Sequence, residues 1–276
     1  MGSQSEVRPL RLAILMADTP LPRTQAAFQT YGGVFIDLFR RALAPTPLES
    51  VFTITTHDVV SDGFEAAYPD LAAVDAILIT GSRHDSFANT PWIEELVAFT
   101  RRALATTAAP PPPPGGAGAD GGEHGNRPHP VRVLGICFGH QICARALGAP
   151  VQRSPTGWEV SVTDVTLSPE GTAFFGQDTL KIHQMHRDAV LAYPPGAVPL
   201  AATTICPVQG MLLPGRAVTV QGHPEFTGPI VREILEARHA AGVIGDDLYG
   251  PGIDRVDGKH DGEAIARAFV KFLRDA

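Results

Sequence analysis

A cysteine framed by glycines is the residue of this chain best suited to nucleophilic chemistry. Cys137 stands in residues 135–141 (GICFGHQ), after the apolar run 131–134 and before a segment, 142–147, whose apolar residues recur at helical spacing. This order predicts a strand, a sharp turn at the cysteine and a helix, which is the layout of a nucleophile elbow. Flanking glycines admit a strained backbone and a close substrate, and a helix N-terminus favours a thiolate.

A histidine and a glutamate near the end of the chain could complete such a site. His223 and Glu225 follow residues 217–221 (AVTVQ), which predict a strand, and Pro224 stiffens the turn between them. A cysteine nucleophile needs a base, and the base needs an orienting group. A lone histidine is more often a structural residue, but its pairing with the framed cysteine favours a catalytic role. The backbone N–H groups of Phe138 and of the Gly81-Ser82 loop are natural donors to an oxyanion.

Alternating strands and helices must position these groups. The sequence predicts strands at 10–16, 51–56, 76–80, 131–134, 158–163 and 217–221, and helices at 34–43, 91–104, 142–147, 229–241 and 262–274. Thr90 is predicted to be the N-cap of the second helix, ahead of Pro91. This alternation predicts an α/β fold with a mostly parallel sheet and helices on both faces. Ser82, Cys137 and His223 follow the carboxyl ends of strands, where reactive groups collect in such sheets.

Length, charge and cysteine usage narrow the class of protein. A chain of 276 residues is long enough for one large α/β domain spanning 1–276, and its net charge of −7 argues against nucleic acid or anionic membrane as the main partner. We expect no signal peptide and no membrane-spanning segment, because no long apolar run is present. Three cysteines without CxxC spacing predict neither a disulfide framework nor a zinc site. A reducing, cytoplasmic location is therefore expected.

Residues 105–130 differ in kind from the rest of the chain. Five consecutive prolines, 110–114, precede a glycine-rich tract. Such a composition cannot build a core and predicts a disordered, solvated insertion that interrupts one domain. A docking motif for a proline-binding partner is the less favoured alternative.

The two motifs together, 135–141 (GICFGHQ) and 222–226 (GHPEF), resemble the class I glutamine amidotransferase family. The resemblance implies a flavodoxin-like three-layer fold and a Cys-His-Glu catalytic triad that hydrolyses γ-glutamyl amides through a γ-glutamyl thioester. It implies that Cys137 is the nucleophile, His223 the base and Glu225 its orienting group. Ser82 and Phe138 would form the oxyanion hole. The residues implied to bind the substrate are Gly81, Gln141, His186, Arg187 and Asp188.

Within the family, the chain is most similar to stand-alone members that resemble the amidotransferase part of GMP synthetase, including plant γ-glutamyl peptidases and fungal relatives. The similar segments are 31–35 (YGGVF), 79–82 (ITGS), 91–93 (PWI) and 183–188 (HQMHRD). In the family, the last segment helps to hold the α-amino and α-carboxyl groups of the glutamyl moiety. Asp188 and Arg187 have the charges to pair with them, although an ordinary charged turn would look the same. His183 and His186 lack an evident third ligand, so no metal site is expected.

Neither a synthetase domain nor a phosphate-binding loop is visible in the sequence. We therefore expect a hydrolase without a cofactor that cleaves small γ-glutamyl compounds, such as glutathione or its conjugates. Two alternatives stay open, a glutaminase subunit that supplies ammonia to a synthetase partner, and a non-catalytic binding protein that retains the fold. The group attached to the γ-glutamyl moiety and the oligomeric state are not specified by the sequence.

Overall fold

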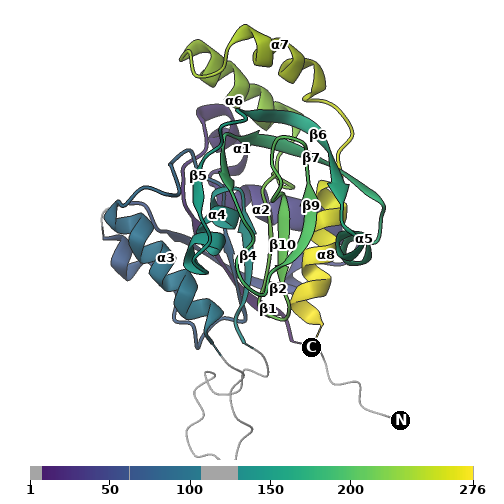
Figure 1. Cartoon of the computed structure of the whole chain (residues 1–276). Coiled ribbons are helices and arrows are strands. Elements are labelled where there is room, and N and C mark those ends of the chain that lie inside the picture. The colour runs from purple at the N-terminus through teal and green to yellow at the C-terminus, as the bar shows by residue number, and fades with distance from the viewer. Residues whose placement is uncertain (1–7, 62, 107–129, 276) are drawn as a thin grey trace, which may run out of the picture.

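A nine-stranded sheet runs through the molecule with helices packed against it (Figure 1). The computed structural model describes residues 8–61, 63–106 and 130–275. The strands are β1 (Leu10–Met16), β2 (Phe52–Asp58), β3 (Ala76–Ile79), β4 (Arg132–Ile136), β5 (Val151–Arg153), β6 (Glu159–Leu167), β7 (Thr179–His186), β8 (Asp188–Val190), β9 (Val198–Ala202), β10 (Gly210–Leu213) and β11 (Ala217–Val220). The α-helices are α1 (Pro22–Phe28), α2 (Tyr31–Leu43), α3 (Pro91–Leu104), α4 (Phe138–Ala146), α5 (Pro169–Phe175), α6 (Gly228–Ala240), α7 (Asp246–Arg255) and α8 (Gly262–Arg274).

The strand order is β2-β1-β3-β4-β11-β10-β9-β6-β7. The first five of these strands are parallel, as predicted, and the last four extend the sheet by antiparallel pairing. β5 and β8 form a separate antiparallel pair. The carboxyl ends of the parallel strands meet at one edge of the sheet, so the residues that follow β3, β4 and β11 come together there.

Alternating side chains of β1 show how both faces of the sheet are covered. Leu12 and Ile14 belong to a buried cluster that includes residues of α2 and α8, whereas Ala13 and Leu15 belong to one that includes residues of α3 and α4. A strand buried on both faces reads as a continuous apolar run. The predicted three-layer, flavodoxin-like arrangement is therefore confirmed. A third cluster joins α6 and α7 to β6 and β7, beyond the parallel half.

One predicted helix cap is absent. α3 begins at Pro91 after Thr90, as predicted, but the Thr90 side chain accepts no capping hydrogen bond. Proline at the first position supplies the helical φ and removes an N–H that would need an acceptor. By contrast, Thr30 and Ser168 do cap α2 and α5 through their hydroxyl groups.

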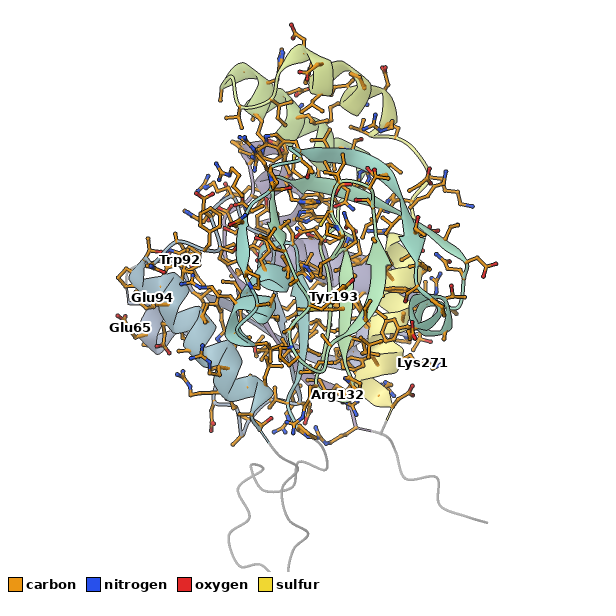
Figure 2. The ribbon with its side chains drawn as sticks, viewed as in Figure 1. Glu65, Trp92, Glu94, Arg132, Tyr193 and Lys271 are labelled. Atoms are coloured by element: carbon orange, nitrogen blue, oxygen red, sulfur yellow. The ribbon has the colours of Figure 1, made fainter. Side chains whose placement is uncertain are left out.

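The proline-rich segment predicted at 105–130 lies almost wholly outside the described residues, which stop at 106 and resume at 130. Its two flanks are joined, because the amide of Val131 donates a hydrogen bond to Thr106 Oγ1 at 2.8 Å. Arg132, at the lower edge of the sheet in Figure 2, donates to the carbonyl oxygen of Phe272 at 2.8 Å. The length of β4 therefore separates these flanks from Cys137.

The three cysteines are unpaired and buried. Cys143 and Cys206 are 0% and 1% exposed. Among the described residues, none of the helices combines the length and the apolar character needed to cross a membrane.

Candidate active site

Cys137 occupies the turn between β4 and α4. Its φ of 51° and ψ of −101° place a non-glycine residue at positive φ, where the structure around it must hold the strained backbone. The flanking glycines instead provide room, because a Cβ on Gly139 would lie 2.2 Å from the carbonyl oxygen of Ile79 and a Cβ on Gly135 would lie 2.7 Å from that of Gly139. The strain expected of the glycines is therefore carried by the cysteine itself.

Three contacts orient His223 after the end of β11. Its amide donates to the carbonyl of His183 at 2.7 Å. Its Nδ1 lies 2.8 Å from Glu225 Oε1, and since a carboxylate can only accept, Nδ1 is the donor. The ring stacks on Phe226, with centroids 3.9 Å apart and planes 2° apart. Nε2 is the nitrogen left for Cys137, which acts electrostatically on this imidazole.

The charges around His223 favour its protonated form. Burial by itself would lower the pKa of this imidazole, but Glu225 and Cys137 outweigh burial and raise the pKa to about 10. The imidazole therefore carries a proton that it can give to a leaving group, and it lies near the cysteine.

The predicted oxyanion donors lie beside this pair. Among the described residues, no group accepts a hydrogen bond from the amides of Ser82 or Phe138. A Cβ on Gly81 would lie 2.6 Å from His223 Cε1 and 3.7 Å from Cys137 Cβ, so the loop after β3 packs directly against both. Free amides next to a nucleophile are suited to hold developing negative charge.

The predicted substrate-binding residues share one cavity, of about 160 Å³, with Cys137. Its walls include Gln141, His186, Arg187 and Asp188. Gly81 lines a neighbouring cavity of about 370 Å³, together with His223 and Glu225. The structure thus brings the predicted residues together at the sheet edge, on two sides of the cysteine.

Two of these side chains already have partners. The amide nitrogen of Gln141 donates to the carbonyl of Asp188 at 2.8 Å and to Gln221 Oε1 at 3.0 Å, and its oxygen accepts from Ser86 at 2.7 Å. The Asp188 carboxylate accepts from Arg153 Nε at 2.9 Å.

Arg187 differs from these two, because its guanidinium is exposed and forms no hydrogen bond or ion pair with a described residue. The segment 183–188 is not a turn. Its first four residues end β7 and Asp188 begins β8.

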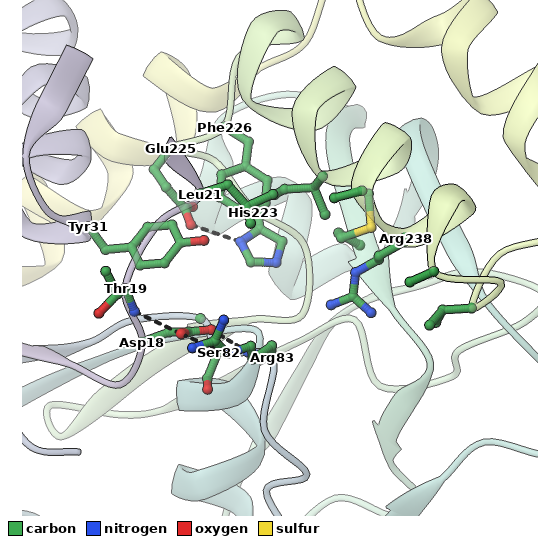
Figure 3. Close-up of a pocket in the computed structure, with 16 residues that line it drawn as sticks. Asp18, Thr19, Leu21, Tyr31, Ser82, Arg83, His223, Glu225, Phe226 and Arg238 are labelled. Atoms are coloured by element: carbon green, nitrogen blue, oxygen red, sulfur yellow. Dashed lines mark hydrogen bonds and ion pairs between the residues drawn. The ribbon is translucent and has the colours of Figure 1, made fainter. Parts of the chain in front are cut away.

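Sequence reasoning missed several residues at the site. Tyr31, at the start of α2, and Arg238, on α6, reach the larger cavity from opposite sides (Figure 3). Trp158 and Arg153 line the smaller one. Tyr31 belongs to the segment 31–35 (YGGVF), whose similarity to the family could have indicated it. Arg238 lies on a helix near the C-terminus, and no sequence motif marks it.

A buried group of Glu159, His186 and Cys206 lies behind the smaller cavity, with ligand atoms within 4.8 Å of one another. Glu159 Oε2 accepts from Gln209 at 2.7 Å and lies 3.0 Å from His186 Nε2. Burial raises the pKa of the Cys206 thiol to about 12, which opposes the thiolate that a metal needs. The group is therefore a buried polar network. His186 is grouped here with Glu159 and Cys206, whereas the sequence had suggested His183 as its neighbour.

Known proteins are similar to this chain in sequence. A family model described as glutamine amidotransferase class-I matches residues 126–237. A glutamine amidotransferase-like protein of Schizosaccharomyces pombe is 31% identical over 265 residues, which cover 95% of this chain and 98% of that protein. Gamma-glutamyl peptidase 4 of Arabidopsis thaliana is 30% identical over 191 residues, which cover 67% of each.

Solved structures share the fold. A glutamine amidotransferase from Thermotoga maritima has a TM-score of 0.66 and 17% identity, covering 98% of this chain and 100% of that one. One from Methylobacillus flagellatus has a TM-score of 0.65 and 18% identity, covering 98% and 97%. With the relative from Schizosaccharomyces pombe similar over nearly its whole length, the chain belongs to the class I glutamine amidotransferase family.

Proposed function

We propose that this chain is a stand-alone cysteine hydrolase that cleaves γ-glutamyl amide or peptide bonds. The observation that carries the proposal is the arrangement of Cys137 in a strained elbow, near an imidazole that Glu225 orients. The name of the Arabidopsis relative, a gamma-glutamyl peptidase, supports the same reaction. Non-catalytic binding is disfavoured, because positive φ at a reactive cysteine is costly to hold without a use.

The first half of the proposed reaction forms a thioester. Cys137 Sγ attacks the γ-carbonyl carbon, and the oxyanion accepts hydrogen bonds from the Ser82 and Phe138 amides. The C–N bond then breaks as His223 gives its Nε2 proton to the leaving nitrogen. The amine departs and the glutamyl group stays on sulfur.

The second half releases glutamate. A water molecule gives a proton to His223 Nε2 and attacks the thioester carbon. The C–S bond breaks, so that the sulfur leaves as a thiolate beside the imidazolium. Glu225 keeps the imidazole in one orientation through both halves. These steps use only groups of the chain and water.

The smaller cavity is suited to the glutamyl group. Its wall combines Cys137 with the free guanidinium of Arg187 and the carboxylate of Asp188, which have the charges to meet an α-carboxylate and an α-ammonium. Glutathione, its conjugates and other γ-glutamyl compounds are the proposed substrates. A cytoplasmic location is part of the proposal, and the three free cysteines are consistent with a reducing compartment.

Mass spectrometry of the protein and its products tests the proposal. Wild-type protein incubated with glutathione, γ-glutamyl dipeptides or glutamine should release glutamate and carry a transient glutamyl adduct on Cys137, whereas Cys137→Ala should do neither. Cys143→Ala, which changes a buried cysteine of α4, should keep the activity if the variant folds. Equal behaviour of wild type and Cys137→Ala on every compound would overturn the proposal. Activity on glutamine alone would favour the glutaminase alternative.

A further inference from the structure

Two cavities flank the catalytic cysteine, and they are unequal. The one that contains Cys137 has a volume of about 160 Å³, and the one that contains His223 and Glu225 has about 370 Å³. Both share a wall that includes Met185 and Arg238. The proposed glutamyl site accounts for the smaller cavity and leaves the larger one without a ligand.

The chemistry of acyl transfer assigns a side to each half of the substrate. The acyl group ends on Cys137, so it occupies the cavity that the cysteine lines. The leaving nitrogen must receive the proton of His223, so the leaving group departs on the side of the histidine. That side is the larger cavity. Figure 3 shows the imidazole at its wall, with the hydroxyl of Tyr31 directed toward it.

The size and lining of this cavity exceed what ammonia requires. Glutamine loses a single nitrogen atom, whereas about 370 Å³ is in the range of cavities that hold small organic ligands. Its walls are largely apolar, with Leu21 and Phe226 on one side and Ile234 and Ala237 of α6 on another. Such walls gain free energy when they cover an apolar group of comparable size.

One cation of the shared wall has no anionic partner among the described residues. The guanidinium of Arg238 lies 4.8 Å from the ring centroid of Trp158, and no described residue forms a hydrogen bond or ion pair with it. Burial lowers its pKa, which shows that it is partly removed from water. Arg83, in the same wall, is by contrast paired with Asp18 at 3.3 Å. A half-buried guanidinium without a counterion is well placed to bind a carboxylate.

We propose that the larger cavity is the leaving-group subsite and that it selects amines with an apolar body and a carboxylate, which Arg238 binds. The preferred substrates are then γ-glutamyl peptides with an apolar second residue. The bond changes are those given above, with the free amino acid or peptide as the amine released. The inference rests on the proposed hydrolysis of γ-glutamyl bonds and adds the class of leaving group.

Three substrates separate the two features of the leaving group. γ-Glutamyl-leucine has the apolar body and the carboxylate, γ-glutamyl-isoamylamide has the same body without the carboxylate, and glutamine has neither. Wild-type kcat/KM should fall by about tenfold or more at each step of this series. Arg238→Met should lower kcat/KM for the dipeptide by about 10- to 100-fold and leave the other two substrates within about threefold. Arg238→Lys should restore part of the loss.

Matched variants on α6 serve as controls. Ala237→Phe should fill the cavity and lower kcat/KM for both leucine-like substrates more than for glutamine. Ala240→Phe, on the exposed face of the helix and outside the cavity, should not. Arg232→Met removes an arginine of the same helix that pairs with Asp257 and should leave all three values unchanged. Circular dichroism establishes that each variant is folded.

The outcomes separate the inference from the reaction beneath it. An equal loss on all three substrates in Arg238→Met would place this arginine on the glutamyl group and overturn the inference, as would no loss on any. Glutamine as the best wild-type substrate would overturn it too. A folded wild-type protein that cleaves glutathione but none of the three would overturn the inference alone, and one that cleaves none of the four would overturn the proposed function.

Discussion

The ring of Phe226 lies flat against the imidazole of His223, with centroids 3.9 Å apart and planes 2° apart. This contact acts across the ring face, while the hydrogen bond to Glu225 acts in the ring plane. Together they restrict both rotations of the histidine side chain, so that Nε2 stays directed at Cys137. The orientation of the base therefore depends on a residue that takes no part in proton transfer.

Removing the flat ring should loosen the base. We expect Phe226→Leu to lower kcat by roughly tenfold, because a branched aliphatic side chain cannot stack on the imidazole. Phe226→Tyr keeps the stacking ring and should retain most of the activity. Steady-state kinetics with γ-glutamyl-leucine measure the effect, and thermal unfolding corrects for lost stability. Unchanged kcat in the leucine variant would show that Glu225 alone holds the ring.

The absence of a side chain at Gly81 should be essential for the relative positions of Cys137 and His223. A Cβ there would lie 2.6 Å from His223 Cε1, so Gly81→Ala must displace the imidazole from Cys137. A displacement of about 1 Å costs on the order of 100-fold in rate. Steady-state kinetics should show this loss in kcat. Gly250→Ala, where a Cβ meets no atom within 4 Å, is the control and should leave the rate unchanged.

The pH dependence of activity should follow the charge of Glu225. Glu225 raises the pKa of His223, so Glu225→Gln should lower that pKa. The imidazolium, which protonates the leaving group, would then be lost at a lower pH. We expect the alkaline limb of the kcat/KM profile, near pH 10 in the wild type, to move down by at least about one unit. An unmoved limb would exclude His223 as the group that it reports, and Glu225→Asp should move it less.

The raised pKa of His223 also makes the stability of the folded protein depend on pH. The pKa of His223 rises from 6.5 to about 10 on folding, so its contribution is fully present below pH 6.5 and is lost as the pH rises through 10. Urea unfolding should therefore show a larger loss of stability between pH 7 and pH 10 in the wild type than in Glu225→Gln. A larger loss in the variant would contradict the assigned coupling.

The positions of the proposed nucleophile and base in the fold were predictable because their signals are local. Cys137 and His223 each follow an apolar strand, and the close packing around the elbow needs glycines at positions 135 and 139 that the sequence displays. The parallel half of the sheet was predictable for the same reason, since β1, β3 and β4 are short apolar runs and β2 is rich in β-branched residues. Motifs of this kind depend on neighbours within a few residues along the chain.

Of the antiparallel strands, β6 was predicted at 158–163, whereas β7, β9 and β10 were not. β7 carries buried polar residues, among them His183 and Gln184, which hide the apolar pattern of a strand. The Gln184 amide donates to Gln209 Oε1 at 2.9 Å, a partner that only folding brings to it. α7 was missed because Gly250, Pro251 and Gly252 lie inside it and are unfavourable in helices. Met185 of β7 lines both cavities, so this part of their walls escaped prediction.

The side chain of Gln141 should contribute more to the framework than to substrate contact. It links α4 to Ser86, to the Asp188 carbonyl and to Gln221 through three buried or part-buried hydrogen bonds. Gln141→Leu would leave these partners unsatisfied inside the protein, at about 1–3 kcal/mol for each group. We expect a clear fall in the urea midpoint and a higher KM, because Asp188 lines the glutamyl cavity. Gln177→Leu removes an exposed hydrogen bond and should change neither value, and a raised KM at unchanged stability would instead place Gln141 in direct contact with the substrate.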